Sequence, residues 1–214
     1  MKTVLFLVDD YWHRADTIQP LANILFPEDS WKMIFTKDPA DLYAVPDLDL
    51  LVSFKAPIEN NQIPTPVWSD TEWTECILKK IESGLGFIAV HSALTALDAS
   101  YMIVKELTHT VFLNHPPQCE VSIHILKEHP VTAGISDFTL PVPDEHYQMK
   151  MVEDDPVTML AETVSRHGRQ PGLWVSEYRK GRICCFTPGH TTESLISDGF
   201  VRVMKNAMDW CCRK

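Results

Sequence analysis

Runs of consecutive apolar residues, bounded by polar or turn-forming residues, recur along the first half of the chain. A short run that is apolar at every position is typical of a strand buried on both faces of a sheet. The clearest run follows two glycines and is followed at once by a histidine. Runs of this kind predict strands at residues 2–8, 31–35, 48–54 and 87–90.

Between these runs, apolar residues recur every three or four positions, which is the spacing of one helix face. The pattern is strongest where Trp73, Ile77 and Ile81 share a face. Strands that alternate with helices favour a doubly wound, mostly parallel α/β sheet with helices on both faces. The spacing predicts helices at residues 16–25, 71–83, 94–107 and 198–211.

The second half of the chain indicates antiparallel structure. Residues 119–126 alternate between apolar and polar side chains, as in a half-exposed strand. Near the C-terminus, two apolar runs separated by a short polar segment predict an antiparallel hairpin added to the sheet. The further expectations are a loop at 108–118, a short strand at 158–161, and hairpin strands at 173–178 and 182–187, all within a single domain spanning residues 1–214.

Composition narrows the classes of function. Charged residues make up 22% of the chain and apolar residues 45%, and the formal net charge is −10. An acidic chain without a basic stripe argues against nucleic-acid binding. No apolar stretch is long enough to cross a membrane, and we expect no secretory leader. The six cysteines form no CxxC pair, so we expect reduced, mostly buried thiols in a cytoplasmic protein.

Polar side chains follow several predicted strands. His91 comes directly after the strand at 87–90, and His190 follows the second hairpin strand. Glu145 lies in a dense polar cluster. Ligands of parallel α/β sheets bind beyond the carboxyl ends of the strands. We therefore expect these three side chains to share one pocket and to be its catalytic residues.

Two imidazoles and a carboxylate have two common uses. One is a divalent metal site, with zinc or manganese held by His91, Glu145 and His190. The other is metal-free general acid–base catalysis by the same groups. A histidine that merely caps the helix after its strand also fits the position of His91. The GxSxG motif of a serine hydrolase is missing around Ser92, and neither GxGxxG nor GxxxxGK[ST] is present.

Several short motifs then follow one another in a fixed order. They are GLG and HSA around the strand at 87–90, HPVT at 129–132, the Asp144-Glu145 pair with Tyr147, Trp174, YRKGR at 178–182, Gly189-His190, and Trp210. Together they resemble the trehalose-utilisation (ThuA-like) family over most of the chain. The resemblance implies a flavodoxin-like sheet similar to that of class I glutamine amidotransferases. It also implies a role in carbohydrate metabolism, on trehalose or a keto-disaccharide.

Within that resemblance, His91 stands where the amidotransferases have their catalytic cysteine, which argues against glutaminase activity. Taken with the three candidate catalytic residues, the resemblance leads us to expect a sugar-modifying enzyme of hydrolase or isomerase type, with a small sugar or sugar derivative as its partner. We expect four further side chains to bind substrate: Asp10, His13, Asp144 and Tyr147.

Two other interpretations remain open from the sequence. One is a non-catalytic sugar-binding or regulatory protein with an amidotransferase-like fold. The other is a structural or interface protein, because we expect the aromatic residues Tyr11 and Trp12 to be exposed. A homodimer is the default expectation for the oligomeric state.

Overall fold

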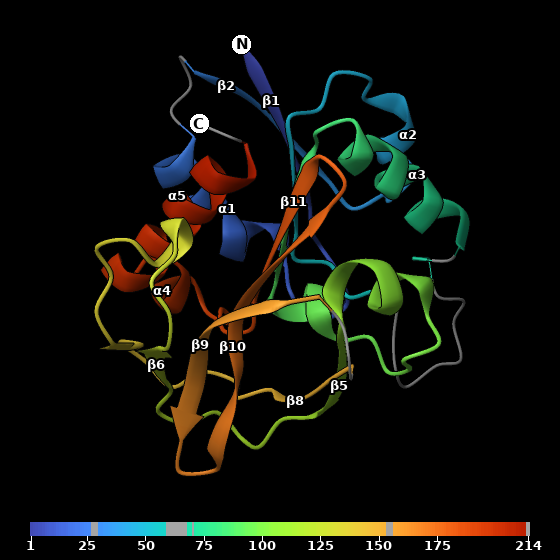
Figure 1. Ribbon diagram of the computed structural model, residues 1–214. Helices are drawn as coiled ribbons and strands as arrows, with labels where there is room; N and C mark the ends of the chain where they lie inside the picture. The colour runs from blue at the N-terminus through green and yellow to red at the C-terminus, as the bar shows by residue number, and fades with distance from the viewer. Residues whose placement is uncertain (27–29, 59–67, 70, 153–155, 213–214) are drawn as a thin grey trace.

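The computed structural model describes residues 1–26, 30–58, 68–69, 71–152 and 156–212, and these residues form a nine-stranded sheet and a two-stranded sheet (Figure 1). The strands are β1 (Lys2–Leu7), β2 (Trp31–Thr36), β3 (Leu50–Ser53), β4 (Gly86–Val90), β5 (Thr110–Asn114), β6 (Ser122–Ile125), β7 (Phe138–Thr139), β8 (Gln148–Met151), β9 (Thr158–Ser165), β10 (Gly168–Tyr178) and β11 (Gly181–Phe186). The α-helices are α1 (Ala15–Leu25), α2 (Asp41–Ala44), α3 (Thr71–Glu82), α4 (Thr192–Leu195) and α5 (Asp198–Cys211).

The large sheet has the strand order β2-β1-β3-β4-β11-β10-β9-β6-β7. The pairs from β2 to β11 are parallel, and the pairs beyond β11 are antiparallel. The first four strands have the order of flavodoxin-like doubly wound folds. The predicted α/β fold, with its parallel sheet and C-terminal hairpin, is therefore confirmed.

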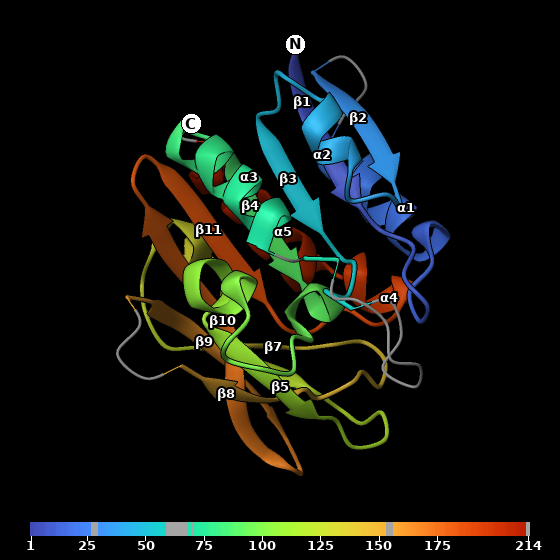
Figure 2. The same ribbon diagram turned by 90° about the vertical axis from the view of Figure 1, so that its right-hand side faces the viewer.

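Helices cover both faces of the parallel strands (Figures 1 and 2). Alternate strand residues point to opposite faces. Phe6 and Val52 pack in one buried cluster with α1 and α5, whereas Leu5 and Leu51 pack in a second cluster with α3. This double burial is the reason why these strands are apolar at nearly every position.

Two expectations for the middle of the chain are wrong. The predicted helix at 94–107 is instead a short 3-10 helix, η1 (His91–Leu94), an irregular segment, and a π-helical turn, η2 (Val104–Thr108). The predicted loop at 108–118 contains β5, which pairs with β8 and also bonds Ala96 through the backbone N–H of Phe112. The partner strand β8 lies far along the chain, so the residues around β5 do not by themselves predict this pairing.

Other expectations hold with adjusted boundaries. The half-exposed strand appears as β6, and the hairpin as β10 and β11. β9 runs beyond the predicted 158–161, and β10 begins at Gly168 because it continues to pair with β9. All six cysteines are free thiols, four of them buried.

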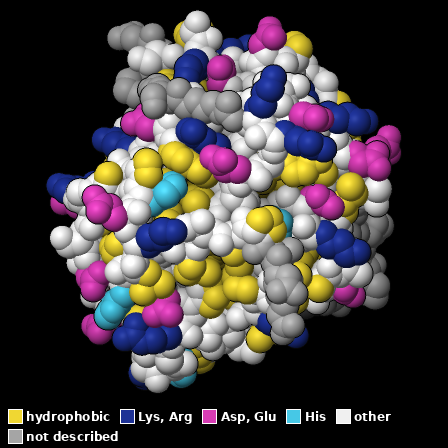
Figure 3. All heavy atoms as spheres, in the orientation of Figure 1, with side chains coloured by type: hydrophobic (Ala, Val, Ile, Leu, Met, Phe, Trp, Pro, Cys, Tyr) yellow, Lys and Arg dark blue, Asp and Glu magenta, His cyan; other side chains and the backbone are white. Residues whose placement is uncertain are grey.

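Within the described residues, no helix is both long and apolar enough to cross a membrane. On the face seen in Figure 3, basic and acidic side chains are interspersed. That face carries no basic stripe of the kind that binds nucleic acid.

Trp174 of β10 joins the large sheet to the segment that leads into β5. Its side chain is fully buried, and its indole N–H donates to the Thr108 carbonyl at 3.0 Å. We expect Trp174→Phe to lower the free energy of unfolding by about 1–3 kcal/mol, because the buried carbonyl loses its donor. Urea denaturation measures the change.

The matched control is Tyr11→Phe, at a side chain that is 63% exposed. It should change the free energy of unfolding by less than about 0.5 kcal/mol. Equal effects of the two substitutions would contradict the role given to the Trp174 bond.

Candidate functional site

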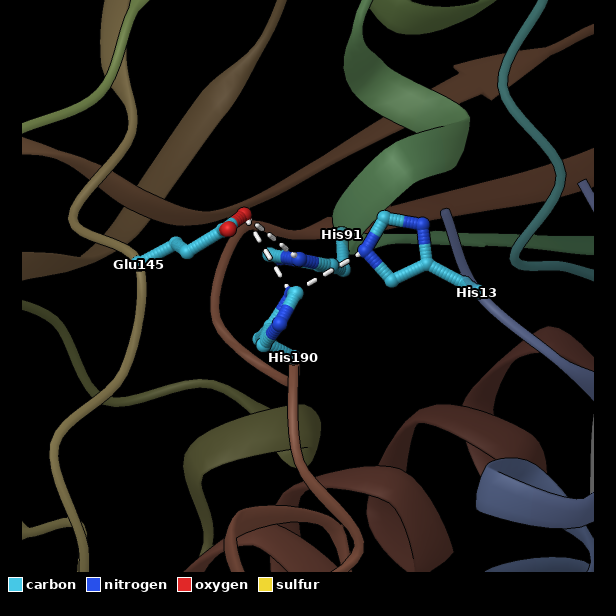
Figure 4. A group of neighbouring side chains, drawn as sticks. All are labelled: His13, His91, Glu145 and His190. Atoms are coloured by element: carbon cyan, nitrogen blue, oxygen red, sulfur yellow. Dashed lines mark hydrogen bonds and ion pairs between the residues drawn. The ribbon is translucent and has the colours of Figure 1, made fainter. Parts of the chain in front are cut away.

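Four side chains from distant parts of the chain converge at the carboxyl edge of the parallel strands (Figure 4). His13 follows β1, His91 follows β4, His190 follows β11, and Glu145 lies between β7 and β8. One donor atom from each residue lies within 4.8 Å of every other. We call these residues the His/Glu cluster. It brings together the three residues predicted to be catalytic, and it adds His13.

His91 is aimed into the cluster by an unusual backbone conformation. It follows the last residue of β4 with φ of +49°, in the left-handed region that few side chains adopt. Its Nδ1 donates to the Thr187 carbonyl at 2.9 Å, so Nε2 is left to face the cluster. The Tyr147 hydroxyl lies 3.0 Å from that Nε2, and the two rings stack with centroids 4.4 Å apart.

His13 is oriented by Asp10. Nδ1 of His13 lies 3.1 Å from Oδ1 of Asp10, whose side chain is fully buried. The same carboxylate accepts hydrogen bonds from the backbone N–H groups of Trp12, His13 and Ala56. With Nδ1 bound in this way, Nε2 of His13 points at Nδ1 of His190, 3.1 Å away. A carboxylate behind a histidine is the usual outer contact of a metal-binding imidazole.

Glu145 closes the cluster through one oxygen. Its Oε2 lies 3.4 Å from His91 Nε2 and 3.3 Å from His190 Nδ1. Its side chain is 13% exposed, so the carboxylate meets solvent on one side only.

Asp144 holds the cluster together without entering it. Its side chain is buried, and Oδ1 accepts from the backbone N–H groups of Glu145 and Gly189 at 2.8 and 3.4 Å. Both carboxylate oxygens lie 3.3 Å from the backbone nitrogen of His190. An isolated bridge to Cys119 fixes Asp144 itself. Asp144, expected to bind substrate, therefore bonds the backbone of Glu145 and His190 and is not among the described residues that line the pocket over the cluster.

Asp10 and His13 both have pKa values below their ordinary ones. Burial alone would raise the pKa of Asp10, but the hydrogen bond and charge of His13, with backbone N–H groups of Ala56 and His13, lower it to about 2. Burial lowers the pKa of His13, and the neighbouring His91 and His190 lower it further against the opposing effect of Asp10. The neutral ring, with a free lone pair, is thus favoured at His13.

The pKa values of Glu145 and His190 shift away from each other. Burial opposes ionisation of Glu145, but hydrogen bonds and charges from His190 and His91 hold its pKa well below the ordinary value. The hydrogen bond to Glu145 raises the pKa of His190, with smaller contributions from the charges of Asp144 and Asp10. A carboxylate that stays ionised, Glu145, therefore lies beside an imidazole that keeps its proton to higher pH than usual, His190.

The donor atoms of the His/Glu cluster fit a divalent metal. Metal–ligand bonds of 2.0–2.1 Å in a tetrahedral site separate ligand atoms by about 3.3 Å. Three of the six donor pairs in the cluster lie 3.1, 3.3 and 3.4 Å apart, and all six lie within 4.8 Å. Three imidazole nitrogens and one carboxylate oxygen are also a donor set that suits zinc or manganese.

A pocket of about 360 Å³ opens over the cluster. His13, Glu145 and Tyr147 face it, while His91 lies beneath and is 1% exposed. The other lining residues are Trp12, Ile58, Ser92, Thr95, Leu97, Phe112, Leu113, Asn114 and His115.

Sequence reasoning missed one feature of this site, a wall of its pocket. His13, expected to bind substrate, lines the pocket and also lies within the His/Glu cluster. Phe112, Asn114 and His115 form a wall of the pocket from the end of β5, in a segment expected to be a loop. A local signal for a strand end was present here. An apolar run followed by Asn114-His115 repeats the pattern that identified His91.

Comparisons with known proteins give one family. The ThuA family model, described as trehalose utilisation, matches residues 4–211. No match was found among proteins of curated function.

Similar solved structures cover nearly the whole chain. A protein named as ThuA-like from Bacteroides uniformis has a TM-score of 0.75 at 18% identity, over 99% of this chain and 91% of that one. Another from Parabacteroides merdae has a TM-score of 0.74 at 18% identity, over 99% and 90%. A cytoplasmic protein from Salmonella typhimurium has a TM-score of 0.63 at 15% identity, over 99% of both chains. At these identities the likeness shows a shared fold.

The contact between Asp10 and His13 predicts a pH-dependent stability. The pKa of Asp10 is about 2 in the folded protein, below its ordinary 3.8. A lowered carboxyl pKa stabilises the fold above the unfolded value, and the stabilisation is lost as the pH falls through the folded value. We expect Asp10→Asn to lower the free energy of unfolding by about 2 kcal/mol at neutral pH.

The difference between the two proteins should shrink as the pH falls from about 4 toward 2. Urea denaturation across that range measures it. Asp16→Asn is the control, at a side chain that is 70% exposed, and should shift stability by less than about 0.5 kcal/mol throughout. A loss in Asp10→Asn that stays constant with pH would exclude the charged contact as its cause.

Proposed function

The chain belongs to the ThuA family, described as trehalose utilisation, and from this premise we propose that it is an enzyme of carbohydrate utilisation acting on a sugar derivative. The observation that carries the proposal is the convergence of His13, His91, Glu145 and His190 beneath a pocket. Several titratable groups with strongly shifted pKa values in one cleft are typical of catalytic sites. A surface that only bound sugars would need hydrogen-bonding groups without such shifts.

We propose further that the His/Glu cluster holds a divalent metal, zinc or manganese. Its donor spacing and the outer contacts of His13 and His91 support this. A metal at this position would polarise a carbonyl or hydroxyl oxygen of the substrate as a Lewis acid. Protons next to the carbonyl of a keto sugar are acidic, so such polarisation suits an isomerase or a hydrolase.

Tyr147 is the hydrogen-bond donor that this arrangement offers. Burial, and then the charge of Glu145, raise its pKa well above the ordinary value, so the hydroxyl keeps its proton. Tyr147 lines the pocket with that hydroxyl beside His91 Nε2. We propose that its O–H donates to the substrate oxygen on which negative charge develops.

Nucleophilic catalysis has less support. The Ser92 hydroxyl donates to the Phe54 carbonyl, which directs it away from attack on a substrate. No cysteine is among the described residues that line the pocket, and burial raises the pKa of Cys184 to about 12. A thiolate nucleophile of the amidotransferase kind requires the opposite shift.

The pocket walls suit a sugar. Trp12, Leu97 and Leu113 offer apolar surface, while Thr95 and Asn114 offer hydrogen-bonding groups. A sugar ring presents both apolar C–H faces and hydroxyls at its edge, and binding pockets commonly combine these two kinds of wall. We propose trehalose or a keto-disaccharide as the substrate class.

Elemental analysis of the purified protein tests the metal. We expect about one zinc or manganese per chain, by the usual stoichiometry of such sites. His190→Ala and Glu145→Gln should each lose the metal and the turnover of keto-trehalose, while the free energy of unfolding of the metal-free protein changes by less than about 2 kcal/mol. His167→Ala, in the exposed turn between β9 and β10, is the control.

Three outcomes separate the interpretations. Loss of folding in both variants would mean that the cluster is structural. Full turnover without metal would favour acid–base catalysis by the same residues. Thermal stabilisation by trehalose without turnover of any sugar would favour the non-catalytic binding protein.

Metal affinity should rise with pH. The raised pKa of His190 means that it holds a proton at higher pH than an ordinary histidine, and a metal must displace that proton. We expect zinc affinity to increase by about tenfold per pH unit between about pH 6 and the pKa of His190. Competition titrations with a chelator measure this slope, and affinity independent of pH would exclude His190 as a ligand.

A further inference from the structure

The pocket over the His/Glu cluster is buried at its floor and apolar where it meets solvent. At the floor, Tyr147 is buried and the side chain of Glu145 is 13% exposed. Three large apolar residues that line the same pocket are exposed instead: Trp12 at 38%, Leu97 at 47% and Leu113 at 55%. We call these three residues the pocket mouth. Single exposed apolar side chains are ordinary, but a group of them around one pocket indicates a surface that binds a ligand.

The indole of Trp12 is held at the pocket by the loop that follows β1. Oδ1 of Asp10 accepts hydrogen bonds from the backbone N–H groups of Trp12 and His13 at 2.8 and 2.6 Å. The backbone N–H of Asp10 donates in turn to the His13 carbonyl at 3.1 Å. The Tyr11 ring meets the Trp12 ring edge to face, with centroids 5.2 Å apart. The loop that aims His13 into the cluster therefore also positions the indole.

The size and lining of the pocket indicate a ligand that extends from the floor to the mouth. Its volume of about 360 Å³ lies near the small end of the range for ligand sites. Thr95 and Asn114 also line it, so hydrogen-bonding groups lie among the apolar ones. A purely apolar group would cover these side chains without pairing them. A pyranose ring has an apolar C–H face and hydroxyls at its edge, and it satisfies both kinds of wall.

We propose that Trp12 is a specificity-determining residue, whose indole face packs against the second ring of a disaccharide and so selects two-ring over one-ring sugars. The inference rests on the proposed function, because that function places a first sugar ring at the His/Glu cluster. An indole is a large, flat apolar surface, and contact with the C–H face of a second ring removes both surfaces from water. The ligand class is a disaccharide with a neutral outer ring.

Calorimetric titration of the purified full-length protein with trehalose and with glucose tests the proposal. We expect trehalose to bind at least about 10-fold more tightly than glucose, which corresponds to the burial of roughly two further apolar carbon groups. Trp12→Ala should remove this preference by weakening the binding of trehalose alone. Trp12→Phe keeps an aromatic face and should retain most of the preference.

The matched control is Tyr43→Ala, at an exposed aromatic side chain of α2 that is not among the described residues lining the pocket. It should leave the affinity for both sugars unchanged. Equal weakening of both sugars by Trp12→Ala would assign the effect to displacement of the neighbouring His13 and would overturn the proposal. A preference for trehalose that survives Trp12→Ala, or that is absent from the unsubstituted protein, would also overturn it.

Binding is measured here without turnover, so this inference and the proposed enzyme can fail separately. A preference for trehalose that depends on Trp12, without turnover of keto-trehalose, would uphold the inference and overturn the enzyme. Turnover of keto-trehalose with an unchanged KM in Trp12→Ala would do the reverse. Conversion of a dimer to a monomer by Trp12→Ala, with the sugar preference unchanged, would assign the pocket mouth to a second copy of this chain and overturn the inference.

Discussion

The constraint on which the site depends is the approach of two ring nitrogens, His13 Nε2 and His190 Nδ1, to 3.1 Å. These residues are 177 positions apart and follow strands β1 and β11, which lie in one sheet with β3 and β4 between them. Two nitrogen lone pairs that face each other at this distance, largely shielded from water, require a proton or a cation between them. The parallel sheet brings the strand ends together, and the buried carboxylates of Asp10 and Asp144 hold the loops.

Burying these polar groups lowers the free energy of unfolding that the rest of the fold provides. Three histidines and two carboxylates lose solvent around the cluster, and His91 adopts a left-handed backbone conformation. Strain and burial of this kind persist where the surroundings over-determine them and where function requires them. The apolar clusters packed on both faces of the sheet provide enough stabilisation to offset this cost.

The β5–β8 pair distinguishes this pocket from the parallel part of the sheet, because β5 supplies one of its walls. The parallel half of the sheet is a frame that many unrelated functions use, and fold alone does not specify chemistry. β5 carries a wall of the pocket, and Trp174 anchors the segment before it to the large sheet. Differences among proteins that share this fold at 18% identity are expected to concentrate in such added elements, because loops and edge additions vary more than a buried frame.

The sequence by itself determined the parallel sheet, the C-terminal hairpin and the candidacy of His91, Glu145 and His190. Strand and helix periodicities are local, and the rule that ligands gather at strand ends then follows. It did not reveal β5, the contact of His13 with His190, or the hydrogen bonds of Asp144 to the backbone of Glu145 and His190. Those depend on contacts between residues far apart in the chain, such as Asp144 with His190 across 46 positions. Only tertiary packing decides such contacts, because no periodicity within one segment records which distant side chain will face it.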